Sequence, residues 1–187
     1  PVVVTVQDVN SNTAATFTGP VTVAFGTNTV GALLTGTTTV NAVAGVATFS
    51  TLSINKTGAG FTLVATSPLL TSATSNAFAT TAGAAVRLSF TTAINNSVGG
   101  ATLTPTITVA AVDALGNTVT TFTDTVRIVI ANNPGAATLS GTVKAVAVAG
   151  VASFSTLAID KAGSGYTLAA SATGLITAAS VPFDVVV

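Results

Sequence analysis

A run of side chains with oxygen donors lies near the N-terminus and could bind a metal ion. Asp8, Asn10 and Asn12 occupy alternate positions, as the first ligands of a calcium-binding loop do. Thr13 stands where such a loop needs glycine, and the chain contains no glutamate to complete a site. Because calcium takes about 6–8 oxygen ligands, these residues are a weak calcium candidate. A hairpin turn held by Asx side chains is the simpler interpretation.

The residue types that are missing exclude most catalytic chemistry. The 187 residues include no His, Cys, Glu, Met or Trp, so the usual zinc, copper, haem and iron–sulfur ligand sets cannot be assembled from them. Thiol nucleophiles and histidine-based triads are excluded for the same reason. Five aspartates remain for paired-carboxylate chemistry, and they lie far apart in sequence. The sequence therefore predicts a protein that is not an enzyme and has no cofactor.

Two asparagines fit the acceptor pattern for N-linked glycans. Asn55 begins Asn-Lys-Thr, and Asn95 begins Asn-Asn-Ser. Such matches are common by chance in a chain rich in Asn and Thr. Both positions are candidate glycosylation sites on the pattern alone.

Charge is sparse and balanced, which limits the classes of partner. Five basic and five acidic residues give a net charge of zero, so no field attracts nucleic acid or an anionic membrane. The mean hydropathy is +0.78, yet the most apolar stretch, 145–152, falls far short of the roughly 20 residues of a membrane span. Residues 1–4 lack the basic leader of a signal peptide. We therefore expect the chain to begin after processing or to be a piece of a longer protein.

The elements that must position these residues occur twice. Residues 44–52 return as 149–157 with few changes, a displacement of 105 positions. The displacement needs no gap between Asp8 and Phe78. It relates other pairs as well: Asp8 to Asp113, Asn12 to Asn117, Gly36 to Gly141 and Phe78 to Phe183. A unit of this length is too long for a solenoid repeat and matches one independently folding domain.

Alternating Val and Thr predict that each copy is all-β. β-Branched residues with a period of two suit half-buried strands, and Gly, Asn and Pro mark turns between them. In the second copy, strands are expected near 85–92, 105–113, 125–130, 137–147, 151–159, 166–172 and 175–187. About seven strands in the second copy, and the later six of them in the first, predict two tandem immunoglobulin-like antiparallel β-sandwiches, with domains at 1–84 and 85–187.

The first copy lacks a counterpart of residues 85–104, which would supply its first strand. A sandwich without that strand has an open edge that must be covered or paired. A longer array of repeats would supply the strand from adjacent sequence, and this is the favoured explanation. Strand donation between subunits is the second. The third is that the domain closes without the strand.

Tyr166 is expected to have a structural role. It follows Gly165 at the start of an expected strand, where sandwiches often place a tyrosine corner whose hydroxyl binds upstream backbone. The first copy has Phe61 at this position. Phe61 fills the same apolar volume but cannot form that hydrogen bond.

A series of motifs runs through the second copy in a characteristic order. They are 87–92 (RLSFTT), 112–117 (VDALGN), 139–142 (LSGT), 151–155 (VASFS) and 159–168 (IDKAGSGYTL). In these motifs the chain resembles the bacterial immunoglobulin-like (Big, or invasin-type) tandem repeats of large secreted and surface proteins. The resemblance implies an immunoglobulin-like fold and an extracellular or cell-surface location. It implies little about function, because such repeats are generic spacers.

The low charge itself suggests what the protein does. Soluble proteins usually carry about a quarter to a third of their surface as charged residues, whereas charged residues are 5% of this chain. We therefore expect a structural module of an extracellular filament, sheath or surface array, assembling with copies of itself or adjacent repeats through strand-edge and apolar or Thr-rich lateral contacts. The alternatives are spacer domains of an adhesin stalk and a carbohydrate-binding accessory module.

Overall fold

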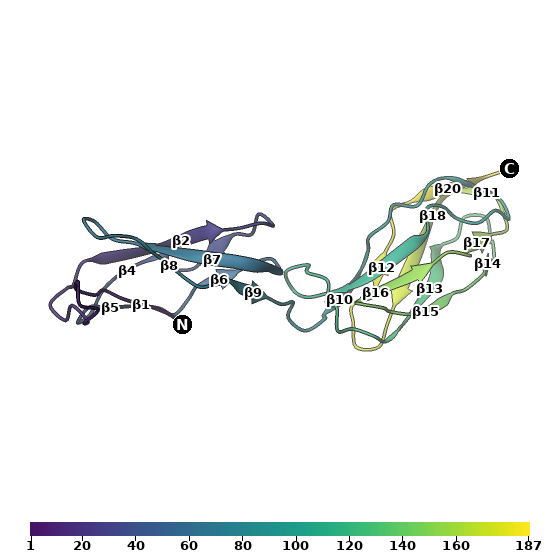
Figure 1. The fold of residues 1–187 in the computed structure, drawn as a ribbon. Helices are drawn as coiled ribbons and strands as arrows, with labels where there is room; N and C mark the ends of the chain where they lie inside the picture. Colours follow the sequence, from purple (N-terminus) through teal and green to yellow (C-terminus); the bar gives the residue numbers. More distant parts are fainter. The chain divides into compact units, whose positions relative to one another are not determined.

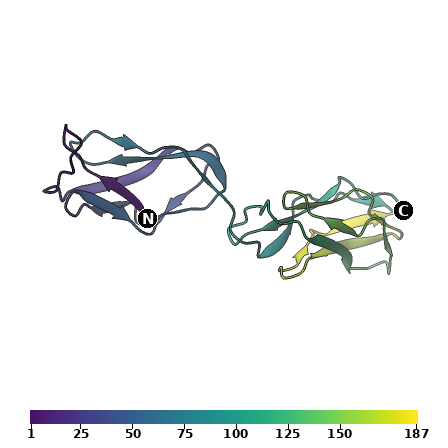
Figure 2. The same cartoon turned by 60° about the horizontal axis from the view of Figure 1, so that its bottom comes forward.

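The computed structural model describes residues 1–187 as β-strands joined by turns and loops (Figure 1). The all-β class expected from the alternating sequence is confirmed. No segment forms a helix of the length and apolar character that crossing a membrane would require. The chain divides into two compact units, Pro1–Thr81 and Ala82–Val187. Figure 2 shows the strands of each unit from a second direction.

The first unit contains nine strands arranged in two layers. These are β1 (Val2–Thr5), β2 (Pro20–Thr27), β3 (Leu34–Thr35), β4 (Thr39–Asn41), β5 (Val46–Phe49), β6 (Ser53–Ile54), β7 (Gly58–Thr66), β8 (Ala73–Thr74) and β9 (Phe78–Thr80). One sheet has the order β4-β2-β7-β8, with β9 also paired to β7. The other layer contains the antiparallel pair β1-β5, and β3 pairs with β6.

The core of the first unit lies between these layers. Val21 and Val23 of β2 are each 2% exposed and meet Phe49 of β5, which is 1% exposed. Thr22, which lies between them on β2, points the other way, because successive side chains of a strand alternate between its faces. The alternation of the sequence therefore becomes one buried face and one solvated face.

The second unit has the same plan with two additional strands. Its strands are β10 (Arg87–Phe90), β11 (Ser97–Val98), β12 (Ile107–Val112), β13 (Thr125–Asn132), β14 (Leu139–Ser140), β15 (Lys144–Val146), β16 (Val151–Phe154), β17 (Ala158–Ile159), β18 (Gly163–Ser171), β19 (Ala178–Ala179) and β20 (Phe183–Val186). One sheet has the order β10-β12-β16, and the other has the order β11-β20-β18-β13-β15, with β19 on β18. β11 runs parallel to β20.

Each of the nine strands of the first unit begins 105 residues before a strand of the second unit. β1 corresponds to β12, β2 to β13, β7 to β18 and β9 to β20. β10 and β11 have no counterpart. The register shift between β2 and β7 at Phe25/Thr27 also returns, between β13 and β18 at Ile130/Asn132. The duplication is therefore one of backbone geometry as well as of sequence.

Three expected strands are interrupted in the structure, and one strand was missed. The segment 137–147 forms β14 and β15 instead of a single strand, because the backbone turns at Gly141, where φ is +90°. A Cβ on Gly141 would lie 2.0 Å from the carbonyl oxygen of Thr156. Segments 151–159 and 175–187 are likewise each divided in two. β11 was missed because two residues are too few to show a period.

Candidate functional site

The Asp8 turn connects β1 to β2 and is held together by its own hydrogen bonds. Asp8 Oδ1 accepts from the backbone amides of Asn10 and Asn12, each at 2.9 Å, and Asn12 Nδ2 donates to Oδ2 at 3.2 Å. These bonds, above all those from Asn12, lower the pKa of Asp8. The arrangement is an Asx turn, with both carboxylate oxygens already engaged. No cluster of three or more His, Cys, Asp or Glu side chains occurs anywhere in residues 1–187.

In the equivalent turn of the second unit, the aspartate is buried. Asp113 is 5% exposed, and its Oδ1 accepts from the amides of Leu115 at 2.9 Å and Asn117 at 2.8 Å. Its Oδ2 accepts from Asn117 Nδ2 at 3.1 Å and from the amide of Gly83 at 3.0 Å. Burial alone would raise the pKa of Asp113, but the hydrogen bonds outweigh it and hold that pKa below its usual value. Asp113 thus fastens the first residues of the second unit to its β12–β13 turn.

Tyr166 forms a corner in the second unit. Its side chain is fully buried, and its hydroxyl donates to the carbonyl oxygen of Lys161 at 2.9 Å. Two glycines make room for the hydroxyl. A Cβ on Gly135 would lie 2.1 Å from Tyr166 Oη, and one on Gly163 would lie 3.1 Å from it.

The first unit forms the equivalent corner with different residues. Phe61 replaces Tyr166 and is also fully buried. The hydroxyl of Thr80 donates to the carbonyl oxygen of Lys56 at 2.7 Å, so this carbonyl keeps a partner. Val30 stands at the position of Gly135, on the side where the tyrosine hydroxyl would lie. Reasoning from the sequence found the missing hydroxyl but not its replacement, although the 105-residue displacement pairs Thr80 with Val185 and Val30 with Gly135.

The two glycan-acceptor asparagines lie in different units. Asn55 is half-buried, and its Oδ1 accepts from the amide of Leu33 at 2.7 Å. Asn95 is exposed, and its backbone amide donates to the carbonyl of Thr104 at 2.9 Å. The side chain of Asn55 is thus part of the fold. That of Asn95 faces solvent.

One edge of the first unit is open beside β1. In the second unit β12 lies between β10 and β16, whereas β1 pairs with β5 alone. A groove of about 350 Å³ runs along residues 4–7 and the connection from β7 to β8. A second groove of about 230 Å³ continues along residues 2–5, over Val23 and Leu63. The sequence predicted the missing strand, and the structure adds the grooves.

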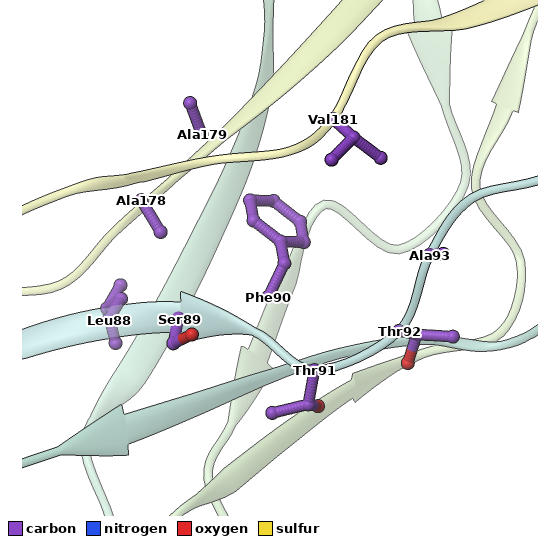
Figure 3. Close-up of a pocket in the computed structure, with 9 residues that line it drawn as sticks. All are labelled: Leu88, Ser89, Phe90, Thr91, Thr92, Ala93, Ala178, Ala179 and Val181. Atoms are coloured by element: carbon purple, nitrogen blue, oxygen red, sulfur yellow. The ribbon is translucent and has the colours of Figure 1, made fainter. Parts of the chain in front are cut away.

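β10 holds the equivalent place in the second unit. Leu88 is 3% exposed, and Phe90 packs against the core. Figure 3 shows Phe90 projecting from β10 toward the segment that contains Ala178, Ala179 and Val181. The sequence of β10 therefore shows which side chains suit this part of the sandwich.

Large apolar side chains are also exposed at equivalent places in the two units. Val43 is 76% exposed at the hairpin between β4 and β5, and Val148 is 77% exposed at the hairpin between β15 and β16. Leu69, between β7 and β8, is fully exposed, with a φ of +62°. No Phe or Tyr side chain is among the exposed large apolar residues.

Solved structures that are similar to this chain include glycosidases and S-layer proteins. A beta-glycosidase from Bacteroides vulgatus is 13% identical with a TM-score of 0.47, over 90% of this chain and 21% of its own. Domains 5-6 of the S-layer protein SbsC are 18% identical with a TM-score of 0.35, over 99% of this chain and 88% of theirs. A longer SbsC structure, domains 4-9, is 20% identical with a TM-score of 0.37, over 98% of this chain and 28% of its own.

The chain spans about a fifth of the length of the glycosidase it matches. No protein-family model matches the sequence, and neither does any curated protein. Identities and TM-scores this low leave the function to be argued from the chain's own surface.

Proposed function

We propose that residues 1–187 are a structural, non-enzymatic repeat module of an extracellular filament, sheath or surface array. The observation that carries the proposal is the exposure of large apolar side chains in both units, on a chain with only five acidic and five basic residues. Neutral surfaces with exposed apolar residues tend to associate. The partners are copies of this chain or adjacent repeats.

The hairpin tips supply one kind of contact. Val43 and Val148 are exposed to almost the same degree, and both precede an alanine with positive φ, Ala44 at +50° and Ala149 at +48°. A left-handed conformation is costly for a residue other than glycine. A turn that keeps this conformation in both copies and presents valine to water fits a contact surface.

The strand edges supply a second kind of contact. β4 is an edge strand, and Thr39, Val40 and Asn41 give it no charged residue. Thr39 Oγ1 lies 2.8 Å from Thr22 Oγ1 across the strand pair. Edge strands that avoid association usually carry a charge, a proline or a bulge. The uncharged edge of β4 therefore favours lateral pairing through its backbone.

The proposal is tested by sedimentation velocity over rising concentration, with negative-stain imaging of the largest species. The informative variant is Val43→Lys with Val148→Lys. The matched control, Ser50→Lys with Ser155→Lys, adds the same charge at exposed, equivalent positions. Association of the wild type and the control, but not of the valine variant, supports the proposal. A wild type that is monomeric at every concentration overturns it, and isolated rods in the images favour the adhesin stalk.

The carbohydrate-binding alternative finds less support. Sugar-binding platforms present aromatic rings to solvent, and no Phe or Tyr is exposed in either unit. We therefore base no second function on it.

A further inference from the structure

β10 joins the two layers of the second unit on one side. The amide of Val86 donates to the carbonyl of Val112 at 2.9 Å, which ties the start of this segment to β12. On the other side, the amide of Leu88 donates to the carbonyl of Ile176 at 2.9 Å, and the amide of Ile176 donates to the carbonyl of Val86 at 3.0 Å. β10 therefore bridges β12 and the connection from β18 to β19.

The residues that β10 contacts have counterparts that line the open groove of the first unit. β10 pairs with residues 109–112 of β12, and the positions 105 residues earlier are 4–7. Ile176 corresponds to Thr71. Residues 4–7 and Thr71 all line the groove of about 350 Å³. The groove of the first unit therefore lies at the position that β10 occupies in the second unit.

The exposure of equivalent residues in the two units shows which part of β1 the missing strand leaves open to solvent. Val109, Ala110 and Ala111 are each fully buried in the second unit. Val4 and Val6, the counterparts of Val109 and Ala111, are half-buried. Thr5, the counterpart of Ala110, is exposed. The difference follows from the neighbouring strand, because the fold on the β5 side is the same in both units.

The backbone of β1 also has free hydrogen-bonding capacity on this side. The amide of Val6 donates to the carbonyl of Gly45 on the β5 side at 2.8 Å. Successive amides of an antiparallel strand point to opposite edges, so those of Val3 and Thr5 point to the open edge. Thr108, the counterpart of Val3, accepts a hydrogen bond from the amide of Thr91, just after β10, at 3.0 Å.

We propose that this groove binds an extended strand with the side-chain chemistry of residues 86–90, antiparallel to β1. In the register of the second unit, the position of Leu88 lies opposite Val6, that of Ser89 opposite Thr5 and that of Phe90 opposite Val4. Apolar side chains at alternate positions enter the groove. The backbone completes the sheet edge, which is recognition by strand addition.

The absence of charged residues from the groove lining favours an apolar strand as its occupant. None of the residues that line either groove is charged, so a charged side chain pointing inward would lose its hydration without a partner. At the rim, Leu69 is fully exposed and Leu70 is 42% exposed. The counterparts of these leucines in the completed unit are Gly174 and a half-buried Leu175. Two consecutive exposed leucines beside an uncharged groove favour an apolar strand.

The first test adds the strand in trans to the full chain. The probe is a synthetic peptide with the sequence of residues 84–92, and the matched control peptide carries Leu88→Asp and Phe90→Asp. Amide hydrogen exchange is followed residue by residue. We expect the probe, and not the control, to slow exchange at Val3 and Thr5 at least tenfold. Exchange at the β5-facing amide of Val6 changes less.

The second test adds the strand in cis. A copy of residues 82–105 is joined directly before Pro1, because Pro1 corresponds to Thr106 and the join keeps the register. We expect the extended chain to protect Val3 and Thr5 without peptide and to unfold its first unit at a higher temperature. The control extension carries the same two aspartates and should do neither.

The outcomes separate this proposal from others. If neither the peptide nor the extension protects Val3 and Thr5, the groove is not a strand acceptor and the proposal is wrong. If the unmodified chain already protects these amides, and does so only as a dimer, the groove is occupied by a second copy of this chain. The proposal of a separate strand with the chemistry of residues 86–90 is then wrong. Protection by the peptide in a monomeric protein supports the proposal even where the self-associating array fails its own test.

Discussion

Replacing Tyr166 by Phe tests how the two units satisfy the same backbone carbonyl. The substitution removes the hydroxyl that donates to the Lys161 carbonyl at 2.9 Å and adds no other group. In the first unit the equivalent carbonyl, that of Lys56, has Thr80 as its donor. The second unit has Val185 at the position of Thr80, so after the substitution the Lys161 carbonyl has no replacement donor.

The expected cost follows from that loss. Losing a hydrogen bond of this kind costs about 0.5–1.5 kcal/mol, and the unfilled space between Gly135 and Gly163 adds to the cost. For a unit of roughly 100 residues, 1 kcal/mol shifts the unfolding temperature by about 4–8 °C. We expect the free energy of unfolding of the second unit to fall by about 1–2 kcal/mol, and its unfolding temperature to fall by roughly 4–16 °C.

The first unit also predicts how to restore the loss. Combining Tyr166→Phe with Val185→Thr places the phenylalanine and the threonine donor of the first unit, Phe61 and Thr80, at the equivalent positions. We expect this double variant to regain most of the lost stability. Adding Gly135→Val should destabilise it, because a Cβ there would still lie 2.6 Å from the carbonyl oxygen of Ala162.

Calorimetry measures the unfolding temperatures, and native-state hydrogen exchange assigns each change to one unit. Amides of the first-unit core, such as that of Val23, serve as the internal reference because the substitutions lie in the second unit. The reasoning is refuted if Tyr166→Phe shifts the unfolding temperature by less than about 1 °C. It is also refuted if the double variant is no more stable than the sum of its single changes predicts.

Three further predictions concern turns and charges. Gly141→Ala should destabilise the second unit by about 3 kcal/mol or more, because alanine is strained at φ +90° and its Cβ would lie 2.0 Å from a backbone oxygen; the urea midpoint measures this, and an unchanged midpoint contradicts it. Because the folded-state pKa of Asp113 is lowered, its contribution to stability is fully present above the unfolded-state pKa of about 3.9 and is lost as the pH falls through the folded-state pKa. Asp113→Asn should therefore flatten the acid limb of the stability profile, and an identical limb in the variant would count against this role. Calcium should not raise the unfolding temperature of the first unit relative to EDTA, because both oxygens of Asp8 are engaged; a rise that Asp8→Asn abolishes would revive the calcium site.

The sequence predicted the fold well where local pattern and long-range packing agree. Alternation in β2 and β13 marks the buried face correctly, since Val21, Val23, Val126 and Ile128 are all buried. The split of 137–147 was not predicted, because a glycine in an alternating segment does not reveal whether the backbone bends there. Gly141 has its effect through a carbonyl 15 residues away, which only the three-dimensional structure brings close.

The candidate site was less accessible from sequence, for a physical reason. The absence of a first strand in the first copy was readable from the alignment of the two copies. The grooves were not, because their walls come from β1, β2, β7 and the β7–β8 connection, which are distant in sequence. The exchange of Tyr166 and Gly135 for Phe61 and Val30 was readable in principle. It needed the knowledge that positions 135 and 166 lie close together in the fold.

The parallel pairing of β11 with β20 determines how the second unit bears mechanical load. Ser97 pairs with Val185 and Val98 with Val186, and the amide of Asp184 donates to Asn96 Oδ1 at 2.9 Å. Tension between Ala82 and Val187 pulls these two strands along their length in opposite directions, so their bonds are sheared together. In the first unit β9 pairs with β7 alone. Under a rising force the first unit should therefore extend before the second, and a stretching trace should show a weak event followed by a strong one.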